Sequence, residues 1–283
     1  MRRLVLIAIF AAALLGGLVM LSSFARSMVY PAPPVRVPSP PPGPLEEVWL
    51  ELDGGDRAAA WVLAPAGLPP GAPVALFFHG NGENLETMRR AGLFEELSGM
   101  GVVILAADYP GYGRSPGRPR EKAILAIGDA ALEWARRSHP ERPAVLAGWS
   151  LGAAVALDVA SRNPDEVAGV VAMSAWTKLE DVAAVHFPRP LVRWALPERY
   201  DSLEAARRLA GRRLPALLVH GERDAIVPAE LGRRLAESLE EGEAAEVRWV
   251  PVPGAGHNDL LAHRQVWVEL RRFLADLSRS PAL

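Results

Sequence analysis

The sequence contains no cysteine, and this absence removes several chemistries at once. Disulfides, thiol nucleophiles and metal sites with cysteine ligands all need that side chain, so none of them applies. The histidines do not pair with one another at metal-ligand spacing either, so we expect no metal. An excess of basic residues is also missing, because 31 lysines and arginines stand against 33 aspartates and glutamates. We therefore expect no nucleic-acid partner.

The N-terminus carries a run without any charge, Leu4 to Phe24, with two arginines before it and one after it. At about 1.5 Å per residue, a helix of this length just crosses a hydrocarbon core about 30 Å thick. We expect residues 1–28 to form a single-pass membrane anchor, with the remainder of the chain on the extracytoplasmic side. A signal sequence cleaved near Ala25, which would leave a secreted protein, is the alternative.

Proline is dense in residues 29–44, which contain the stretch YPAPPVRVPSPPPGP. Proline cannot donate ladder hydrogen bonds, and its fixed backbone angle favours polyproline II. We therefore expect a semi-rigid spacer between the membrane and a domain that begins at Leu45.

From Leu45 onward, apolar runs of strand length alternate with amphipathic segments of helix length. This alternation predicts an α/β fold with a mostly parallel central sheet and helices on both faces. Strands are expected at residues 46–52, 58–64, 73–80, 102–110, 144–150, 167–175, 215–222 and 246–254. Helices are expected at residues 83–100, 121–137, 151–163, 229–239 and 258–277. In such sheets chemistry collects beyond the carboxyl ends of the strands.

The strand at 144–150 runs straight into a helix through Gly-Trp-Ser-Leu-Gly, with Ser150 between Gly148 and Gly152. A sharp strand-to-helix turn strains its middle residue and needs small neighbours. The pattern is typical of a nucleophile elbow, which holds a serine Oγ at the sheet edge. The backbone N–H of Leu151 would then face a developing oxyanion. The plainer interpretation is that Ser150 only caps the helix.

An acid and a histidine follow the serine in the order that such an enzyme needs. Asp224 comes after the strand at 215–222, with Glu222 as its rival, and His257 lies in a glycine-flanked loop after the strand at 246–254. A free hydroxyl needs a base, so we assign His257 as that base and Asp224 as the group that orients it. A helix cap and a surface loop histidine are the structural alternatives.

The strand at 73–80 ends in His79-Gly80, followed by the small-residue turn around Asn81. This pattern predicts the second arm of an oxyanion hole, with the Asn81 backbone N–H as donor beside that of Leu151. His220 is expected to pack at the end of its strand. The other three histidines are interpreted as surface or cap residues: His139, His186 and His263.

These motifs resemble the α/β-hydrolase superfamily over about Leu45 to the C-terminus. Within it, the chain is similar to the bud-emergence-protein-like branch of membrane-tethered α/β-hydrolase domain-containing proteins, often grouped with serine aminopeptidase-type domains. The resemblance is carried by FFHGNGEN, DYPGYGRSPGRP, AGWSLGAAVAL, LEDVAAVHFPRPLVRW, ERYDSLEAARRL, LLVHGERDAIVP and PGAGHNDL. It implies the same nucleophile, acid, base and oxyanion donors, and it makes residues 108–113 a structural loop lining the site. Gly82 and Glu83 replace an alanine and a glycine of the branch, which leaves the backbone donor in place.

The resemblance also implies a cap over the site at about residues 176–206, a segment that mixes aromatic side chains with prolines. Such a cap suggests an apolar acyl group in the substrate, although these side chains would also serve simply to cover the sheet.

Together these features predict a serine hydrolase that cleaves a carboxylic ester or thioester of small-molecule or lipid-like character through an acyl-enzyme, with no cofactor. The alternatives are a serine peptidase or amidase, and a non-catalytic membrane-tethered binding module on the same scaffold. A serine at the elbow argues against thiol or carboxylate nucleophiles.

Overall fold

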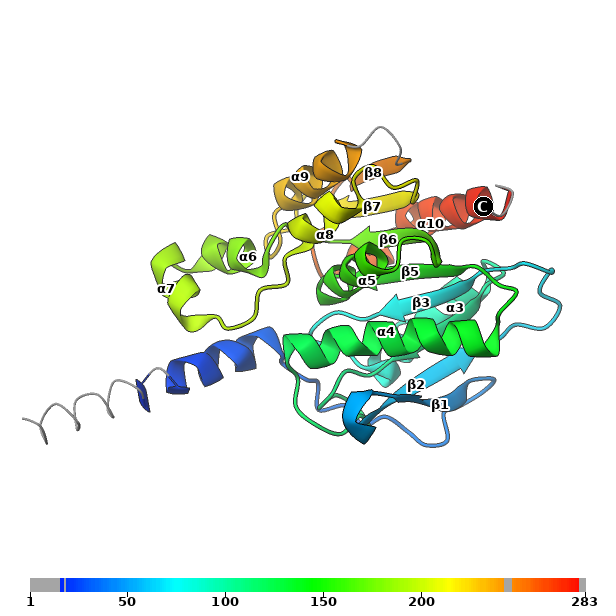
Figure 1. The fold of residues 1–283 in the computed structure, drawn as a ribbon, viewed down its shortest axis with the longest axis horizontal. Coiled ribbons are helices and arrows are strands. Elements are labelled where there is room, and N and C mark those ends of the chain that lie inside the picture. Colours follow the sequence, from blue (N-terminus) through cyan, green and yellow to red (C-terminus); the bar gives the residue numbers. More distant parts are fainter. Residues whose placement is uncertain (1–15, 18, 242–245, 280–283) are drawn as a thin grey trace, which may run out of the picture.

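A single eight-stranded sheet forms the centre of the computed structural model (Figure 1), which describes residues 16–17, 19–241 and 246–279. The strand order is β1-β2-β4-β3-β5-β6-β7-β8, and only β2 runs against the others. The strands are β1 Glu46–Glu51, β2 Arg57–Leu63, β3 Val74–Phe78, β4 Val103–Ala107, β5 Ala144–Trp149, β6 Val167–Met173, β7 Ala216–Gly221 and β8 Val247–Val252. The predicted mostly parallel sheet is confirmed.

Helices cover both faces of this sheet, as the unbroken apolar strands predict. One face carries α4 (Glu121–Ser138), α5 (Leu151–Arg162), α8 (Ser202–Leu209) and α9 (Ala229–Glu240). The other face carries α2 (Leu85–Arg90), α3 (Leu93–Ser98) and α10 (Arg264–Arg279). Two separate apolar clusters result, one on each side of the sheet.

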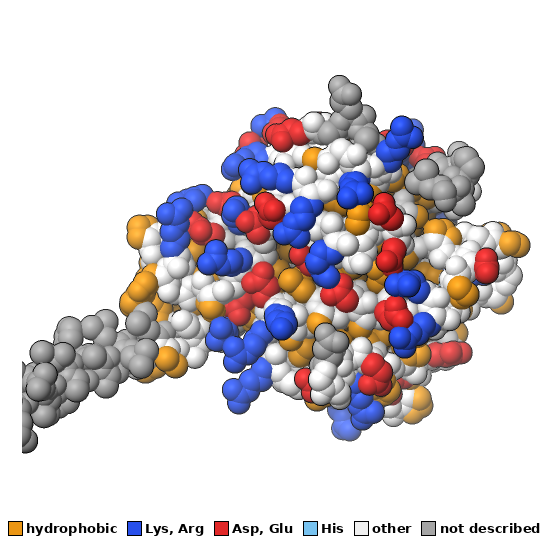
Figure 2. Space-filling model, viewed as in Figure 1, with side chains coloured by type: hydrophobic (Ala, Val, Ile, Leu, Met, Phe, Trp, Pro, Cys, Tyr) orange, Lys and Arg blue, Asp and Glu red, His pale blue; other side chains and the backbone are white. Residues whose placement is uncertain are grey.

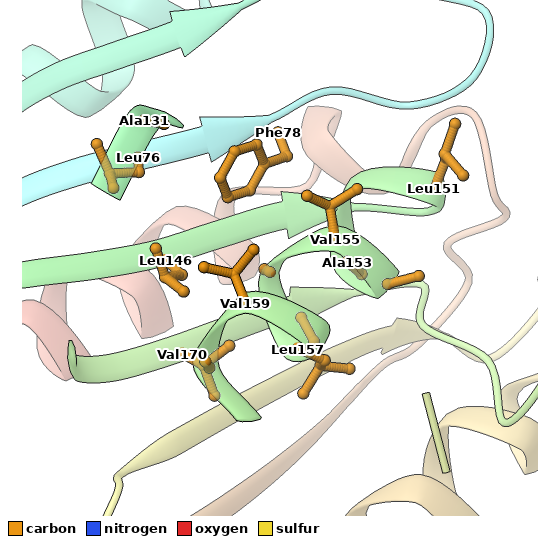
Figure 3. Packing of buried hydrophobic residues seen from close by; sticks show 14 of the residues in the cluster. Leu76, Phe78, Ala131, Leu146, Leu151, Ala153, Val155, Leu157, Val159 and Val170 are labelled. Atoms are coloured by element: carbon orange, nitrogen blue, oxygen red, sulfur yellow. The ribbon is translucent and has the colours of Figure 1, made fainter. Parts of the chain in front are cut away.

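Side chains of β5 alternate between these two clusters, as the period of a strand requires. Leu146 packs with α5 residues such as Val155 and Val159 (Figure 3), whereas Val145 and Ala147 join the cluster on the opposite face. Since β5 and α5 are buried almost throughout, the turn between them is anchored on both sides.

Two expected helices differ from the sequence prediction. The segment 83–100 forms two helices because Gly92, with φ of 78°, adopts the left-handed conformation between them. The last helix begins at Arg264, later than expected, and a 3-10 turn at Leu260–Ala262 precedes it.

The N-terminal segments are only partly described. The predicted membrane run falls largely outside the described residues, and within the part that the structure describes no helix is both long and apolar enough to span a bilayer. Residues 19–29 are helical and lead to the domain (Figure 1). The expected spacer differs from the prediction: Tyr30 and Val37 are buried against the domain, because their apolar side chains find partners in its two clusters.

The segment between β6 and α8 contains two short helices, α6 (Leu179–His186) and α7 (Arg189–Ala195). They lie beyond the carboxyl ends of the parallel strands (Figure 1). Trp176 is buried in the core cluster, but Phe187 and Trp194 of the same segment face solvent. The aromatic side chains of the expected cap therefore divide between core and surface.

At the junction between β5 and α5, backbone segments pack directly against each other at Gly148 and Gly152. A Cβ at Gly148 would overlap the backbone of Gly152, and a Cβ at Gly152 would overlap the carbonyl of Phe78 at the end of β3. Both glycines are therefore required by close approach, as the sequence predicts.

We predict that Gly152→Ala lowers the free energy of unfolding by about 3 kcal/mol, because neither backbone can yield without moving a buried strand or helix. The matched control is Gly82→Ala, since a Cβ there meets nothing within 4 Å. Its unfolding free energy should stay within about 0.5 kcal/mol of the wild type. Equilibrium urea unfolding of both variants tests this, and equal stability of the two would contradict the close approach.

Candidate active site

Ser150 lies at the carboxyl end of β5, where the chain turns into α5. Its φ of 56° and ψ of −114° are unusual for a residue with a side chain, and its N–H donates to the Met173 carbonyl at 2.8 Å. His257 approaches from the loop after β8, and its Nε2 lies 3.0 Å from the Ser150 Oγ. Serine and histidine, 107 positions apart, thus share a hydrogen bond at the predicted sheet edge.

Asp224 holds the other side of the His257 ring. The His257 Nδ1 lies 2.7 Å from the Asp224 Oδ2, while the backbone N–H groups of Ile226 and Val227 donate to Oδ1. The rival acid, Glu222, is exposed. The structure therefore brings together the three residues that the sequence singled out for the acid, base and nucleophile.

A second histidine, His220 of β7, contacts the same carboxylate. Its Nε2 lies 2.8 Å from the Val227 carbonyl and 3.4 Å from the Asp224 Oδ2. A carbonyl only accepts, so Nε2 carries the proton. Burial alone would raise the pKa of Asp224, but hydrogen bonds from His220 and His257 outweigh it and hold that pKa below its usual range. The sequence analysis missed this contact; the only signal was a histidine four positions before the acid.

The predicted oxyanion loop begins where β3 ends. Tyr109 donates to the carbonyl of His79 at 2.7 Å, and Tyr112 donates to the carbonyl of Asn81 at 2.8 Å. These bonds fix the direction of the loop carbonyls. Across the described residues, neither the Asn81 N–H nor the Leu151 N–H donates to a protein acceptor. Both predicted donors are thus unused.

The chain before the domain also braces this loop. The Asn81 side chain donates to the Val29 carbonyl at 3.2 Å, and the Asn84 side chain donates to the Val35 carbonyl at 2.7 Å. Tyr30 shares a hydrogen bond of 2.9 Å with Tyr200, which follows the α6–α7 segment. The stretch expected to be a spacer is therefore in contact with the candidate site.

Two buried titratable side chains, His79 and Asp108, flank the loop and form no hydrogen bond with the serine. Burial lowers the pKa of His79 to about 4, so the ring is neutral at neutral pH and forms no ion pair with Asp108, 3.9 Å away. Burial raises the pKa of Asp108 to about 7, although hydrogen bonds from the backbone N–H groups of Leu85 and Arg114 lower it. Asp108 thus has the structural role expected for its loop. In the described part of the chain no cluster of side chains could hold a metal.

Glu83, which replaces a glycine of the resembling branch, is part of the same loop. Its Oε2 accepts the N–H of Gly80 at 3.1 Å, and burial raises the pKa of its carboxyl to about 7 despite this bond. A carboxyl group whose pKa is higher in the folded state than in the unfolded state stabilises the fold at low pH. This contribution to the free energy of unfolding disappears as the pH rises.

We predict that Glu83→Gln weakens the pH dependence of stability. In the wild type the Glu83 contribution is complete below about pH 4.5 and disappears as pH rises to about 7. Glutamine keeps an acceptor for Gly80 but does not titrate, so the variant should lose less stability across this window. Urea unfolding at several pH values measures it. The control, Glu95→Gln, removes an exposed carboxylate on α3 and should follow the wild type; identical profiles for all three proteins would refute the assignment.

Comparison with known proteins bears on the family of the chain. A family model described as alpha/beta hydrolase fold matches residues 73–197, and one described as TAP-like protein matches residues 193–280. The chain is 37% identical to the uncharacterized protein Rv2307c of Mycobacterium tuberculosis, over 97% of this chain and 96% of that protein. It is 28% identical to protein bem46 of Schizosaccharomyces pombe, over 74% of this chain and 72% of that protein.

Among solved structures, the esterase Pf2001 of Pyrococcus furiosus superposes with a TM-score of 0.68, over 89% of this chain and 98% of that one. At 18% identity this likeness concerns the fold alone. The sheet order, the strand-to-helix turn at Ser150 and the two family matches lead to one assignment. The chain belongs to the α/β-hydrolase superfamily, in the branch that contains bem46.

Proposed function

We propose that this protein is a serine hydrolase that cleaves a carboxylic ester or thioester through an acyl-enzyme on Ser150. The observation that carries the proposal is the continuous hydrogen-bonded chain from Asp224 through His257 to Ser150. Each link has the length of a normal hydrogen bond, and each residue comes from a different loop at one edge of the sheet.

The protonation states follow from the partners of the His257 ring. Nδ1 faces a carboxylate, so it carries the proton, and the lone pair of Nε2 faces the Ser150 Oγ. Asp224 stays ionised because its pKa is held low. In the proposed reaction His257 accepts the serine proton as Oγ attacks the carbonyl carbon, and Asp224 stabilises the imidazolium that forms.

The negative charge that develops on the substrate oxygen needs donors that are already in place. We assign this role to the backbone N–H groups of Leu151 and Asn81, the former at the N-terminus of α5, where the helix dipole favours an anion. His257 then gives its proton to the leaving group. A water molecule, deprotonated by His257, releases the acid and restores Ser150.

The proposed substrate has an apolar acyl group and reaches the site from the side where α6 and α7 lie. The Pyrococcus furiosus protein that shares this fold is an esterase, which supports a hydrolase. A serine peptidase or amidase uses the same three residues, and a non-catalytic binding module would keep them without turnover, so both are outcomes of the test below.

We predict that Ser150→Ala lowers the hydrolysis of p-nitrophenyl esters by at least about 10⁴-fold, because no other group takes over the attack. The full chain would be assayed with acyl groups from acetyl to palmitoyl, and the optimum would size the pocket. A fluorophosphonate probe should label the wild type and not the variant. Turnover of a p-nitroanilide alone would favour the amidase. If the wild type shows neither turnover nor labelling, the non-catalytic binding module becomes the remaining interpretation.

His220 generates a separate prediction, because it acts on the reaction only through Asp224. His220→Leu should lower kcat about 10-fold with KM nearly unchanged. A lost hydrogen bond to a charged group costs about 1.5–3 kcal/mol, and part of this cost would reach the reaction because Asp224 would orient His257 less well. His220→Gln restores an N–H near the position of Nε2 and should recover most of the activity. A merely structural role would instead lower stability in both variants without the rescue of kcat.

A further inference from the structure

Large apolar side chains that face solvent are concentrated on two segments of the described chain. One group lies on the N-terminal helix and the other on the α6–α7 segment, and in the latter Trp194 is 56% exposed. The first group consists of Val19, Met20, Phe24 and Met28, and the second of Val185, Phe187, Leu191 and Trp194. We call these eight residues the apolar rim.

The two halves of the rim are held next to each other by buried contacts. Arg26 of the N-terminal helix pairs with Glu198 at 2.9 Å, just after α7, and the Glu198 side chain is almost completely buried. The hydrogen bond between Tyr30 and Tyr200 adds a second link. Figure 2 shows hydrophobic side chains gathered at the left of the molecule, beside the N-terminal segment. The two segments that carry the rim are therefore neighbours.

The apolar rim lies at the same edge as the candidate active site. The parallel strands β3, β5, β6 and β7 all point toward α6, α7 and the N-terminal helix (Figure 1). Ser150 follows the end of β5, and Ile226, another exposed apolar side chain, lies two positions after Asp224. An apolar layer pressed against the rim would thus lie at the edge of the sheet that carries the serine.

The chain itself indicates which apolar layer this is. The uncharged run from Leu4 to Phe24 extends into the exposed N-terminal helix, and a run of that length and composition is typical of a segment that enters a lipid bilayer. Four charged side chains of α6 and α7 near the rim are paired with one another, Arg189 with Asp181 at 2.6 Å and Arg193 with Glu180 at 2.8 Å. Such pairing lowers the cost of bringing α6 and α7 to an interface, and an exposed tryptophan favours that position.

We propose that the apolar rim docks on the surface of a lipid bilayer and sets the candidate active site against it, so that an ester held in the membrane enters from the lipid. This extends the anchor predicted from the sequence, because the domain itself contacts the lipid. The choice of substrate rests on the proposed hydrolase function, whereas the docking does not.

The absence of cysteine makes the docking directly measurable. Leu191→Cys on α7 and Ser138→Cys at the far end of α4 each give a single site for a bimane label, and both positions are exposed. The full-length protein would be reconstituted in phosphatidylcholine vesicles with and without brominated acyl chains. Bromine should quench the label at 191 and leave the label at 138 unchanged. Equal fluorescence loss at both positions, or none at either, would overturn the docking.

Activity separates the docking from the chemistry. The double variant Val185→Ser with Leu191→Ser should hydrolyse p-nitrophenyl palmitate in phosphatidylcholine vesicles about 10-fold more slowly, because two apolar anchors are lost. Hydrolysis of soluble p-nitrophenyl acetate should be unchanged, and so should the unfolding temperature. Equal loss with both esters, or loss with neither, would reject entry from the lipid. If the wild type cleaves no ester and Ser150 is not labelled, the hydrolase proposal fails, while bromine quenching still decides the docking.

Discussion

Close backbone packing at the β5–α5 junction is the constraint on which the rest of the site depends. Only glycine at 148 and 152 lets the turn approach the end of β3. Ser150 is held there with φ of 56°, a strain of about 1–3 kcal/mol that the buried strand and helix on either side sustain. The same approach places the loop that starts at His79 beside the serine. The proposed nucleophile and the candidate oxyanion donor are thus positioned by one packing contact.

At the sheet edge, the pKa of each buried carboxyl group depends on how many hydrogen bonds it accepts. Asp108 accepts two backbone N–H groups, yet burial prevails and raises the pKa of its side chain to about 7. Asp224 also accepts two backbone N–H groups, but two histidine rings lie against its other oxygen, and the pKa falls. At neutral pH, Asp224 is therefore ionised whereas Asp108 is only partly ionised, which suits Asp108 to structure and Asp224 to the support of an imidazolium.

The sequence predicted those parts of the molecule that depend on local pattern. Apolar runs placed the strands, and Gly-x-Ser-x-Gly placed the elbow, because glycine spacing and strand ends are visible in the chain itself. The contacts of His220 with Asp224, of Glu83 with Gly80, and of Asn81 with Val29 were missed. Two of these join residues across a turn whose shape no pattern encodes. The third joins segments 52 positions apart, and a proline-rich composition suggested solvent there rather than packing.

That third contact gives the N-terminal segment a role in the site. The carbonyl of Val29, the last residue of the N-terminal helix, accepts the side chain of Asn81, whose own N–H is the proposed oxyanion donor. Three residues earlier, Arg26 pairs with the buried Glu198 behind α7. A helix fixed at both the oxyanion loop and the α6–α7 segment cannot tilt without moving both. If the apolar rim rests on lipid, the position of the domain on the membrane and the geometry of the proposed oxyanion hole are set by the same few contacts. Attachment to the bilayer then becomes part of how the active site is held in shape.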